Sequence, residues 1–288
     1  MNLVVGATGN VGGAVCEALR AQGKPVRAMA RKSSDPDRVR RLEELGAEIV
    51  RGELRDPDSL ARACESVDTV ISGATTITSL GTDSISAVDR DGQLSLVDAA
   101  HDASVGHFIY VSYTCHVDTD DPLTEAKRAV EQRLRDSGLG FTILRPSYFM
   151  EMWLGPALGW ELAEGRVRVL GSGEQRVNWI SAKDVVTAIV ACVDNPRALG
   201  QTIELGGPEA LSPNEVIRLA QSFVDQPILV ERVPAETLER QANEAAGTDA
   251  SIFPCLMLCQ TRGDEIAAAP EWLRPRTTVA EYFRSALA

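Results

Sequence analysis

The chain is poor in the residues that build metal sites and disulfide frameworks. It has three histidines and six scattered cysteines among 288 residues. Only Cys255 and Cys259 lie close together, and no histidine or second cysteine pair completes a site around them. We therefore expect no metal ion and a reducing, cytoplasmic environment.

Positive charge and long apolar runs are also scarce. The 29 lysines and arginines are outnumbered by 41 aspartates and glutamates, so the net charge is −12. No basic stripe offsets the phosphates of a nucleic acid, and no apolar run approaches the length of a membrane span. We expect a small-molecule substrate, with neither nucleic acid nor membrane as a partner. An oligomer or a regulatory partner stays open.

The first half of the chain alternates short apolar runs with amphipathic segments. Runs typical of buried strands occur at 2–5, 24–30, 47–51, 68–72, 107–111 and 140–144. Helical patterns lie between them, at 37–45, 57–64, 88–103 and 123–136. This alternation predicts an α/β fold of the Rossmann type, with a doubly wound parallel sheet.

A glycine-rich turn follows the first of these strands. Residues 6 to 12 read Gly6-Ala7-Thr8-Gly9-Asn10-Val11-Gly12, and a helical apolar stripe begins at Val11. Gly6 would permit the tight turn, Gly9 a close approach of the backbone to a pyrophosphate, and Gly12 close packing of helix on strand. The N-terminus of the helix offers N–H groups to phosphates. An ordinary strand–helix turn is the alternative, but this placement favours dinucleotide binding.

The alternation of strands and helices ends near residue 150, where glycines and prolines separate shorter elements. Helices are expected at 181–193, 212–223, 235–246 and 279–286, and a strand at 202–205. We expect 1-150 to form an NAD(P)-binding Rossmann domain, with 176-206 contributing to its sheet. Residues 151-175 and 207-288 are expected to form a smaller substrate-binding lobe.

The residues after the second strand indicate which dinucleotide is bound. An acidic residue there binds the ribose 2′-hydroxyl of NAD, whereas an arginine accommodates the 2′-phosphate of NADP. The position holds Arg31 and Lys32, and aspartates follow only at 35 and 37. A solvated basic turn is the alternative. We expect NADP(H) as the cofactor, with NAD(H) as the second choice.

A lysine interrupts the apolar face of the predicted helix 123–136. At about 100° per residue, Lys127 shares one face with Leu123, Val130 and Leu134. A lysine on a buried face must be paired, snorkelling or functional. It lies near the helix N-terminus, which in a doubly wound sheet is close to the cofactor. Lys127 is therefore a candidate to bind the nicotinamide ribose and to assist proton transfer.

Together these residues resemble those of the atypical short-chain dehydrogenase/reductases, in particular the NmrA-like group with its isoflavone-reductase and quinone-reductase relatives. The resemblance covers most of the chain. Besides the glycine turn it is carried by Arg31, 110–112, Lys127 with Glu131, 137–151, 180–185 and 205–209.

The resemblance implies a cofactor site assembled from several segments. Its residues, besides Gly6, Gly12, Arg31, Lys32 and Lys127, are Thr8, Gly9, Asn10 and Val11 at the pyrophosphate, Glu53 and Leu54 at the adenine, Ser72, Gly73 and Ala74 at the nicotinamide-side ribose, and Pro146, Ser147, Tyr148 and Phe149 at the nicotinamide. The substrate pocket is expected to include Tyr148, Phe149, Met152 and Trp153. A core position for these apolar side chains is the alternative.

One position departs from the pattern of the superfamily. Short-chain dehydrogenases commonly carry a proton-donating tyrosine four residues before the lysine, where this chain has Leu123. The isoflavone-reductase relatives also lack that tyrosine. The proton donor is then expected among Tyr113, Ser112, Tyr148 and Lys127 itself.

Three functions compete on these grounds. The first is an NADPH-dependent reductase of a small conjugated or aromatic carbonyl or quinone. The second is a non-catalytic NADP(H)-binding redox sensor or regulator of the NmrA type. The third is an NAD-dependent epimerase or dehydratase, which Arg31 and Leu123 disfavour. A lysine retained on an apolar face favours the reductase, because a sensor has less need of it.

Overall fold

The computed structural model describes residues 1–77, 83–264 and 266–287, and its chain forms two compact units. Unit 1 comprises Met1–Ser112, Pro122–Leu144 and Val186–Ile203. Unit 2 comprises Tyr113–Asp121, Arg145–Val185 and Glu204–Ala288. The glycine turn and Lys127 both belong to unit 1.

Unit 1 is built around a seven-stranded sheet with the strand order β3-β2-β1-β4-β5-β6-β9. The strands are β1 Asn2–Val5, β2 Val26–Ala30, β3 Glu48–Arg51, β4 Thr69–Ser72, β5 His107–Val111, β6 Phe141–Pro146 and β9 Gln201–Leu205, of which the last two end in unit 2. The pairs from β3 through β6 are parallel. Strands β1, β4 and β5 are buried along their whole length, as expected for a sheet covered on both faces. The predicted doubly wound α/β fold is confirmed.

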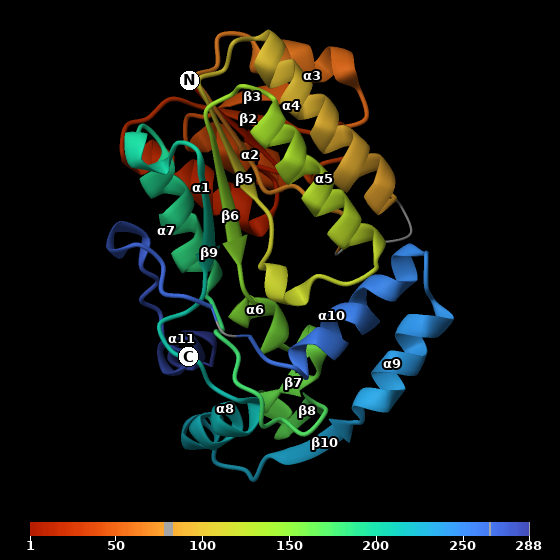
Figure 1. The fold of residues 1–288 in the computed structure, drawn as a ribbon. Coiled ribbons are helices and arrows are strands. Elements are labelled where there is room, and N and C mark those ends of the chain that lie inside the picture. The colour runs from red at the N-terminus through yellow and green to blue at the C-terminus, as the bar shows by residue number, and fades with distance from the viewer. Residues whose placement is uncertain (78–82, 265, 288) are drawn as a thin grey trace. The chain divides into compact units, whose positions relative to one another are not determined.

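Helices cover both faces of this sheet. They are α1 Asn10–Ala21, α2 Pro36–Glu44, α3 Pro57–Cys64, α4 Gln93–Asp102 and α5 Pro122–Asp136, with α7 Ala182–Cys192 shared between the units. Helices α3, α4 and α5 pack side by side on one face, and α1 and α2 lie on the other (Figure 1). Asp56 caps α3 by accepting from Ser59 N, with Pro57 in the first turn, which confirms the predicted start of that helix.

The helix predicted over 88–103 is not α-helical throughout. A π-helix covers Ser86–Gly92, and α4 begins only at Gln93. Asp89, within this π-helical stretch, is fully buried. Gly92 fits there because a Cβ at that position would lie 2.7 Å from the Cβ of Leu54. Short π-helical stretches in longer helices are frequent at functional sites.

His107, at the start of β5, makes the stability of unit 1 depend on pH. Its Nε2 lies 2.8 Å from the Thr142 hydroxyl, which itself donates to Ala198 O at 2.7 Å, so Nε2 carries the proton. Burial lowers the pKa of His107 from 6.5 to about 4. Between these two values the unfolded chain binds the proton and the folded chain does not.

Acidification from pH 7 to pH 4 is therefore expected to lower the free energy of unfolding by about 3 kcal/mol through this side chain. Denaturant titrations across that range measure the slope. The variant His107→Gln should reduce the dependence of the unfolding free energy on pH. The variant His101→Gln should not, because the His101 side chain is exposed. Equal slopes for wild type and His107→Gln would contradict the assignment.

Unit 2 contains a second, three-stranded sheet with the order β10-β8-β7. Its strands are β7 Trp160–Glu161, β8 Arg166–Leu170 and β10 Leu229–Val233; β10 is parallel and β7 antiparallel to β8. The helices of this unit are α6 Met150–Trp153, α8 Pro213–Ala220, α9 Ala235–Glu244, α10 Ile252–Gln260 and α11 Val279–Ala286. The helix expected over 212–223 begins with a capping box, since Ser212 and Glu215 each accept from the other's backbone N–H.

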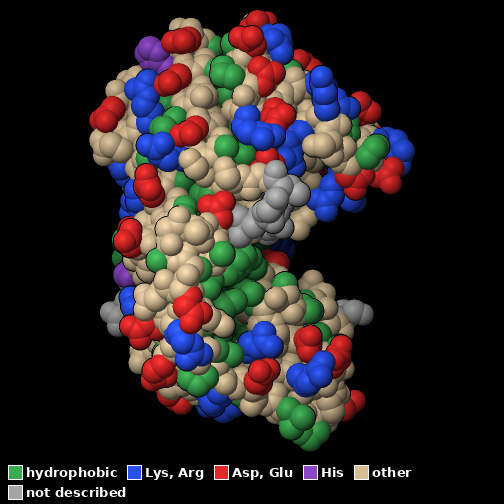
Figure 2. All heavy atoms as spheres, turned by 90° about the vertical axis from the view of Figure 1, so that its right-hand side faces the viewer, with side chains coloured by type: hydrophobic (Ala, Val, Ile, Leu, Met, Phe, Trp, Pro, Cys, Tyr) green, Lys and Arg blue, Asp and Glu red, His purple; other side chains and the backbone are tan. Residues whose placement is uncertain are grey.

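The surface carries charges of both signs. Figure 2 shows acidic and basic side chains interspersed over the face turned to the viewer. Across residues 1–77, 83–264 and 266–287, no helix combines the length and the apolar character needed to span a bilayer. All six cysteines are free thiols, and only Cys115 is exposed.

Candidate functional site

The glycine turn brings the start of α1 against the end of β1. Gly6 has φ +85°, a conformation that favours glycine, and its carbonyl accepts from Gly9 N at 2.9 Å. A Cβ on Gly12 would lie only 2.2 Å from the oxygen of Gly6. The predicted roles of Gly6 and Gly12 in a tight turn and in close packing thus have a direct geometric basis.

The N-terminus of α1 is arranged to receive an anion. Gly9 is the N-cap, so no side chain there accepts from the first N–H groups of the helix. The guanidinium of Arg38, on α2, donates to Thr8 O at 2.7 Å and reaches Asn10 Oδ1 at 3.4 Å. Backbone donors, the helix dipole and a guanidinium therefore converge on Thr8, Gly9 and Asn10.

A second group of arginines gathers beyond the ends of β2 and β3. Arg31 lies 3.1 Å from Asp83, which also pairs with Arg55 at 3.2 Å. The guanidinium of Arg51 donates to Arg31 O at 3.1 Å, and the backbone N–H of Arg31 donates to Ser34 Oγ at 3.0 Å. About half of the Arg31 side chain remains exposed. Arg55 also pairs with Glu53, so a phosphate here would compete with two carboxylates for several guanidinium groups.

The end of β4 lies beside the glycine turn. Ser72 Oγ donates to Gln93 Oε1 at 2.8 Å, and Gln93 Nε2 donates to Ala74 O at 3.0 Å. A Cβ on Gly6 would lie 3.1 Å from the Cα of Ala74. Gln93 thus holds the segment 72–74 close to the glycine turn. The family resemblance assigns both segments to the cofactor site.

Lys127 is buried in unit 1 and faces a carboxylate. Its side chain is 6% exposed, and its Nζ lies 3.9 Å from Asp89 Oδ1 and donates to Val111 O at 3.4 Å. The centroid of the Tyr110 ring is 5.1 Å from the same nitrogen. The other oxygen of Asp89 accepts from the N–H and hydroxyl of Thr76, at 2.9 and 2.7 Å. Burial lowers the pKa of Lys127, and Asp89 opposes that shift.

Ser112, which follows β5, belongs to a buried ionic network. Its hydroxyl donates to Glu131 Oε1 at 2.7 Å and accepts from Arg128 at 3.0 Å. Glu131 is completely buried on α5 and also accepts from Arg128 and Arg135. The two guanidinium groups compensate the buried carboxylate, and the network fixes the Ser112 hydroxyl.

Lys32, Glu53 and Leu54 lie in unit 1, whereas the residues predicted for the nicotinamide and the substrate lie in unit 2. Pro146, Ser147, Tyr148, Phe149, Met152 and Trp153 follow one another around the end of β6 and α6, and Tyr113 lies in another segment of the same unit. Ser147 donates to the buried carboxylate of Asp264. The Tyr148 hydroxyl donates to Leu256 O at 3.4 Å, and burial raises the pKa of Tyr148. Its ring meets Trp153 edge-on at 4.7 Å.

Sequence reasoning missed several charged residues of the unit 1 site, among them Arg38, Arg55, Asp83 and Asp89. Asp89 lies in a segment predicted as an amphipathic helix, where an acidic residue indicates a solvated face. Arg38 had one usable signal, since it lies in the helix that directly follows the Arg31 turn.

A comparison with known families shows which family the chain belongs to. The NmrA-like family matches residues 2–254. The chain belongs to the NmrA-like family. An NAD(P)H azoreductase of Xenophilus azovorans is 31% identical over 247 residues, which cover 85% of this chain and 80% of that protein.

Other proteins similar to this chain carry different names. The photosystem II assembly factor Ycf39 of Trieres chinensis is 26% identical, over 81% of this chain and 72% of its own length. Among solved structures, the NADPH complex of a quinone oxidoreductase from Escherichia coli superposes with a TM-score of 0.78. It is 19% identical and covers 100% of both chains, so it shows the fold.

Proposed function

We propose that this chain is a cytoplasmic NADPH-dependent reductase of small conjugated or aromatic carbonyl compounds, quinones included. The observation that carries the proposal is Lys127, a buried ammonium group in the same unit as a glycine turn shaped for a pyrophosphate. A relative 31% identical to this chain is named an NAD(P)H azoreductase, and the NADPH-dependent quinone oxidoreductase shares the fold. The free thiols are consistent with a reducing compartment.

The residues of unit 1 fit NADPH. Thr8 to Gly12 would hold the pyrophosphate through backbone N–H groups, and the missing Cβ of Gly12 lets α1 pack closely against the Gly6 turn that presents them. Arg31 and Lys32 would hold the 2′-phosphate, with Arg38 and Arg55 adding positive charge.

The other parts of the cofactor are assigned to the positions that the family resemblance implies. Glu53 and Leu54 would lie at the adenine, and 72–74 at the nicotinamide-side ribose. Residues 146–149 would lie at the nicotinamide, with Met152 and Trp153 lining the substrate pocket.

Lys127 is the proposed proton donor. When bound, the reduced nicotinamide supplies a hydride to an electrophilic carbon of the substrate. Lys127 would bind the ribose hydroxyls and release a proton toward the oxygen that gains charge, since its lowered pKa eases that release. Ser112 donates its proton to Glu131 and Tyr148 donates to Leu256, so both hydroxyls already have acceptors. Tyr113 is retained as the second candidate.

The preference for NADPH over NADH is expected to depend on Arg31. Replacing it by alanine removes a charged partner of the 2′-phosphate, so the dissociation constant of NADPH should rise about tenfold or more. That of NADH should change little. Nucleotide fluorescence titrations give both constants, and Arg41→Ala, an exposed arginine on α2, is the matched control. Equal losses for the two nucleotides in Arg31→Ala would refute this role.

Turnover is the test of the function itself. NADPH consumption is followed with a panel of quinones, enones and aromatic aldehydes. The proposal expects turnover with members of this panel and much less with NADH. Tight NADPH binding without turnover on any compound would instead support a redox sensor.

A further inference from the structure

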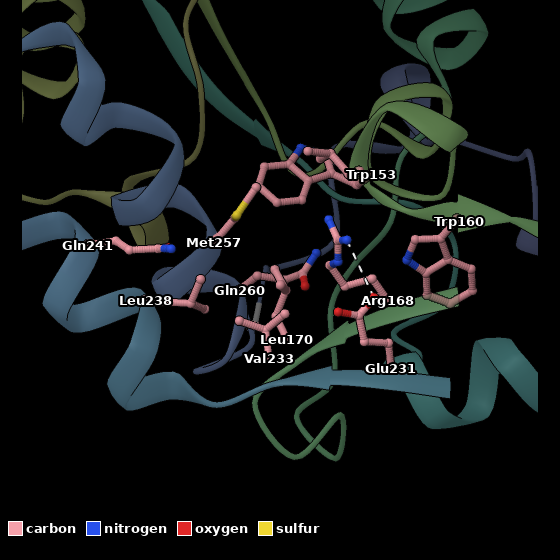
Figure 3. A pocket seen from close by; sticks show the side chains of 11 residues that line it. Trp153, Trp160, Arg168, Leu170, Glu231, Val233, Leu238, Gln241, Met257 and Gln260 are labelled. Atoms are coloured by element: carbon pink, nitrogen blue, oxygen red, sulfur yellow. Dashed lines mark hydrogen bonds and ion pairs between the residues drawn. The ribbon is translucent and has the colours of Figure 1, made fainter. Parts of the chain in front are cut away.

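Unit 2 encloses a cavity of about 320 Å³ that none of the proposed cofactor contacts uses. It lies between the sheet β10-β8-β7 and the helices α9 and α10, with Trp153 of α6 on a third side (Figure 3). Its volume is at the lower end of the range for small-molecule sites, which suits a ligand of one or two rings.

The walls of the cavity combine polar surface with apolar and aromatic surface. Trp153 and Trp160 are 6% and 5% exposed, and Leu170, Leu238 and Met257 add aliphatic and thioether surface. Large flat side chains of this kind stack against aromatic rings at little entropic cost, since few torsions must be fixed. The wall therefore favours a planar, unsaturated ligand.

Arg168, on β8, brings a positive charge into this cavity. Among the residues that the structure describes, Arg168 forms an ion pair only with Glu231 on β10, at 3.4 Å. The side chain of Arg168 is 46% exposed and that of Glu231 is 69% exposed. An exposed pair at that distance is weak, and a guanidinium has five N–H donors, so most donors of Arg168 remain available to a ligand. Gly159, with φ +86°, leaves room for the side chain, because a Cβ there would lie 2.7 Å from the Cβ of Arg168.

Gln260 supplies a second polar group, and this one is buried. It is 5% exposed at the end of α10, and within the described part of the chain no residue hydrogen-bonds to its side-chain amide. In Figure 3 the amide of Gln260 and the guanidinium of Arg168 point toward the same space. The residue as a whole is buried, but its amide is open to the cavity that it lines, so a ligand there can hydrogen-bond to it.

We infer that this cavity binds a small aromatic carboxylate. The ring would lie against Trp153 and Met257, and the carboxylate would accept from Arg168 and from the Gln260 amide. The net charge of −12 repels anions, so Arg168 is the feature that selects for one. Trp153 is shared with the proposed substrate pocket, but the inference concerns binding by unit 2 alone and does not rest on the proposed reductase activity.

Calorimetric titration of the full chain without nucleotide tests it, with 2-naphthoate as the probe and 2-naphthylmethanol as its neutral analogue. The wild type should bind naphthoate more tightly. Arg168→Gln should weaken naphthoate by about tenfold or more and leave naphthylmethanol nearly unchanged, because the lost hydrogen bonds are to a charged group. Arg166→Gln is the matched control, since Arg166 lies two residues earlier on β8 and pairs with Glu161 and Glu164 instead.

A second variant shifts the affinity in the opposite direction. Glu231→Gln removes the competing carboxylate, so naphthoate should bind severalfold more tightly. The inference is overturned if naphthoate does not bind, if the neutral analogue binds equally well, or if Arg168→Gln and Glu231→Gln leave naphthoate affinity unchanged. A separate titration of the same variants with NADPH shows whether a loss of naphthoate binding is accompanied by a loss of cofactor binding.

Discussion

Replacing Lys127 by alanine is expected to lower kcat by about 10²–10⁴-fold, the range for loss of a positioned proton donor. The dissociation constant of NADPH should rise by only about tenfold, since the ribose loses one charged partner while the pyrophosphate contacts remain. Steady-state kinetics and nucleotide titration on the same preparation separate these effects. The reason lies in the burial of Lys127, which lowers its pKa while Asp89 and Val111 hold its nitrogen in place.

Lys183→Ala is the control for the loss of a lysine, because Lys183 is exposed at the start of α7 in unit 2. It should leave kcat unchanged. Turnover by Lys127→Ala within a few-fold of wild type would show that the proton comes from another group, with Tyr113 the next to replace.

Gly12→Ala is expected to impair both folding and cofactor binding. The added Cβ would lie 2.2 Å from Gly6 O, so the turn and helix α1 must move apart. Overpacking of this kind costs about 1–3 kcal/mol of unfolding free energy. NADPH affinity should fall about a hundredfold, as one or two charge-assisted bonds to the pyrophosphate are lost. Denaturant titration and nucleotide binding measure the two effects.

The neighbouring glycine provides the matched control. A Cβ on Gly13 would approach Ala7 O only to 3.3 Å, and alanine is a better helix former than glycine. Gly13→Ala should stay within about 1 kcal/mol of wild-type stability and keep its NADPH affinity. Similar behaviour of the two variants would mean that close packing at Gly12 has no special role.

The fold of unit 1 was predictable because its signals are local. The runs that became β1, β4 and β5 are short, apolar and separated by helical patterns, so both period and length indicate buried parallel strands. The second sheet was missed for the opposite reason. Strand β10 is almost wholly exposed, and its partner β8 alternates arginine with valine, so neither resembles a buried run.

Parts of the candidate site were predictable to the same degree. Gly6, Gly12 and Lys127 each differ from the residue type that the surrounding sequence leads one to expect. Such a departure can be recognised in a single sequence. Asp89 was not predictable, because its burial depends on Thr76 and Lys127, thirteen residues before it and far beyond it in the chain. The cavity around Arg168 was likewise invisible, since residues from three separate segments line it.

Transfer of deuterium from the cofactor tests the central claim most directly. NADPH labelled at nicotinamide C4, on each face in turn, is consumed with a quinone or enone that the chain turns over, and the product is analysed by mass spectrometry. A reductase of the proposed kind places the label in the enone product, or shows a primary isotope effect with a quinone, for one of the two labelled forms. Neither label transfer nor an isotope effect with either form would contradict hydride transfer and the proposed function.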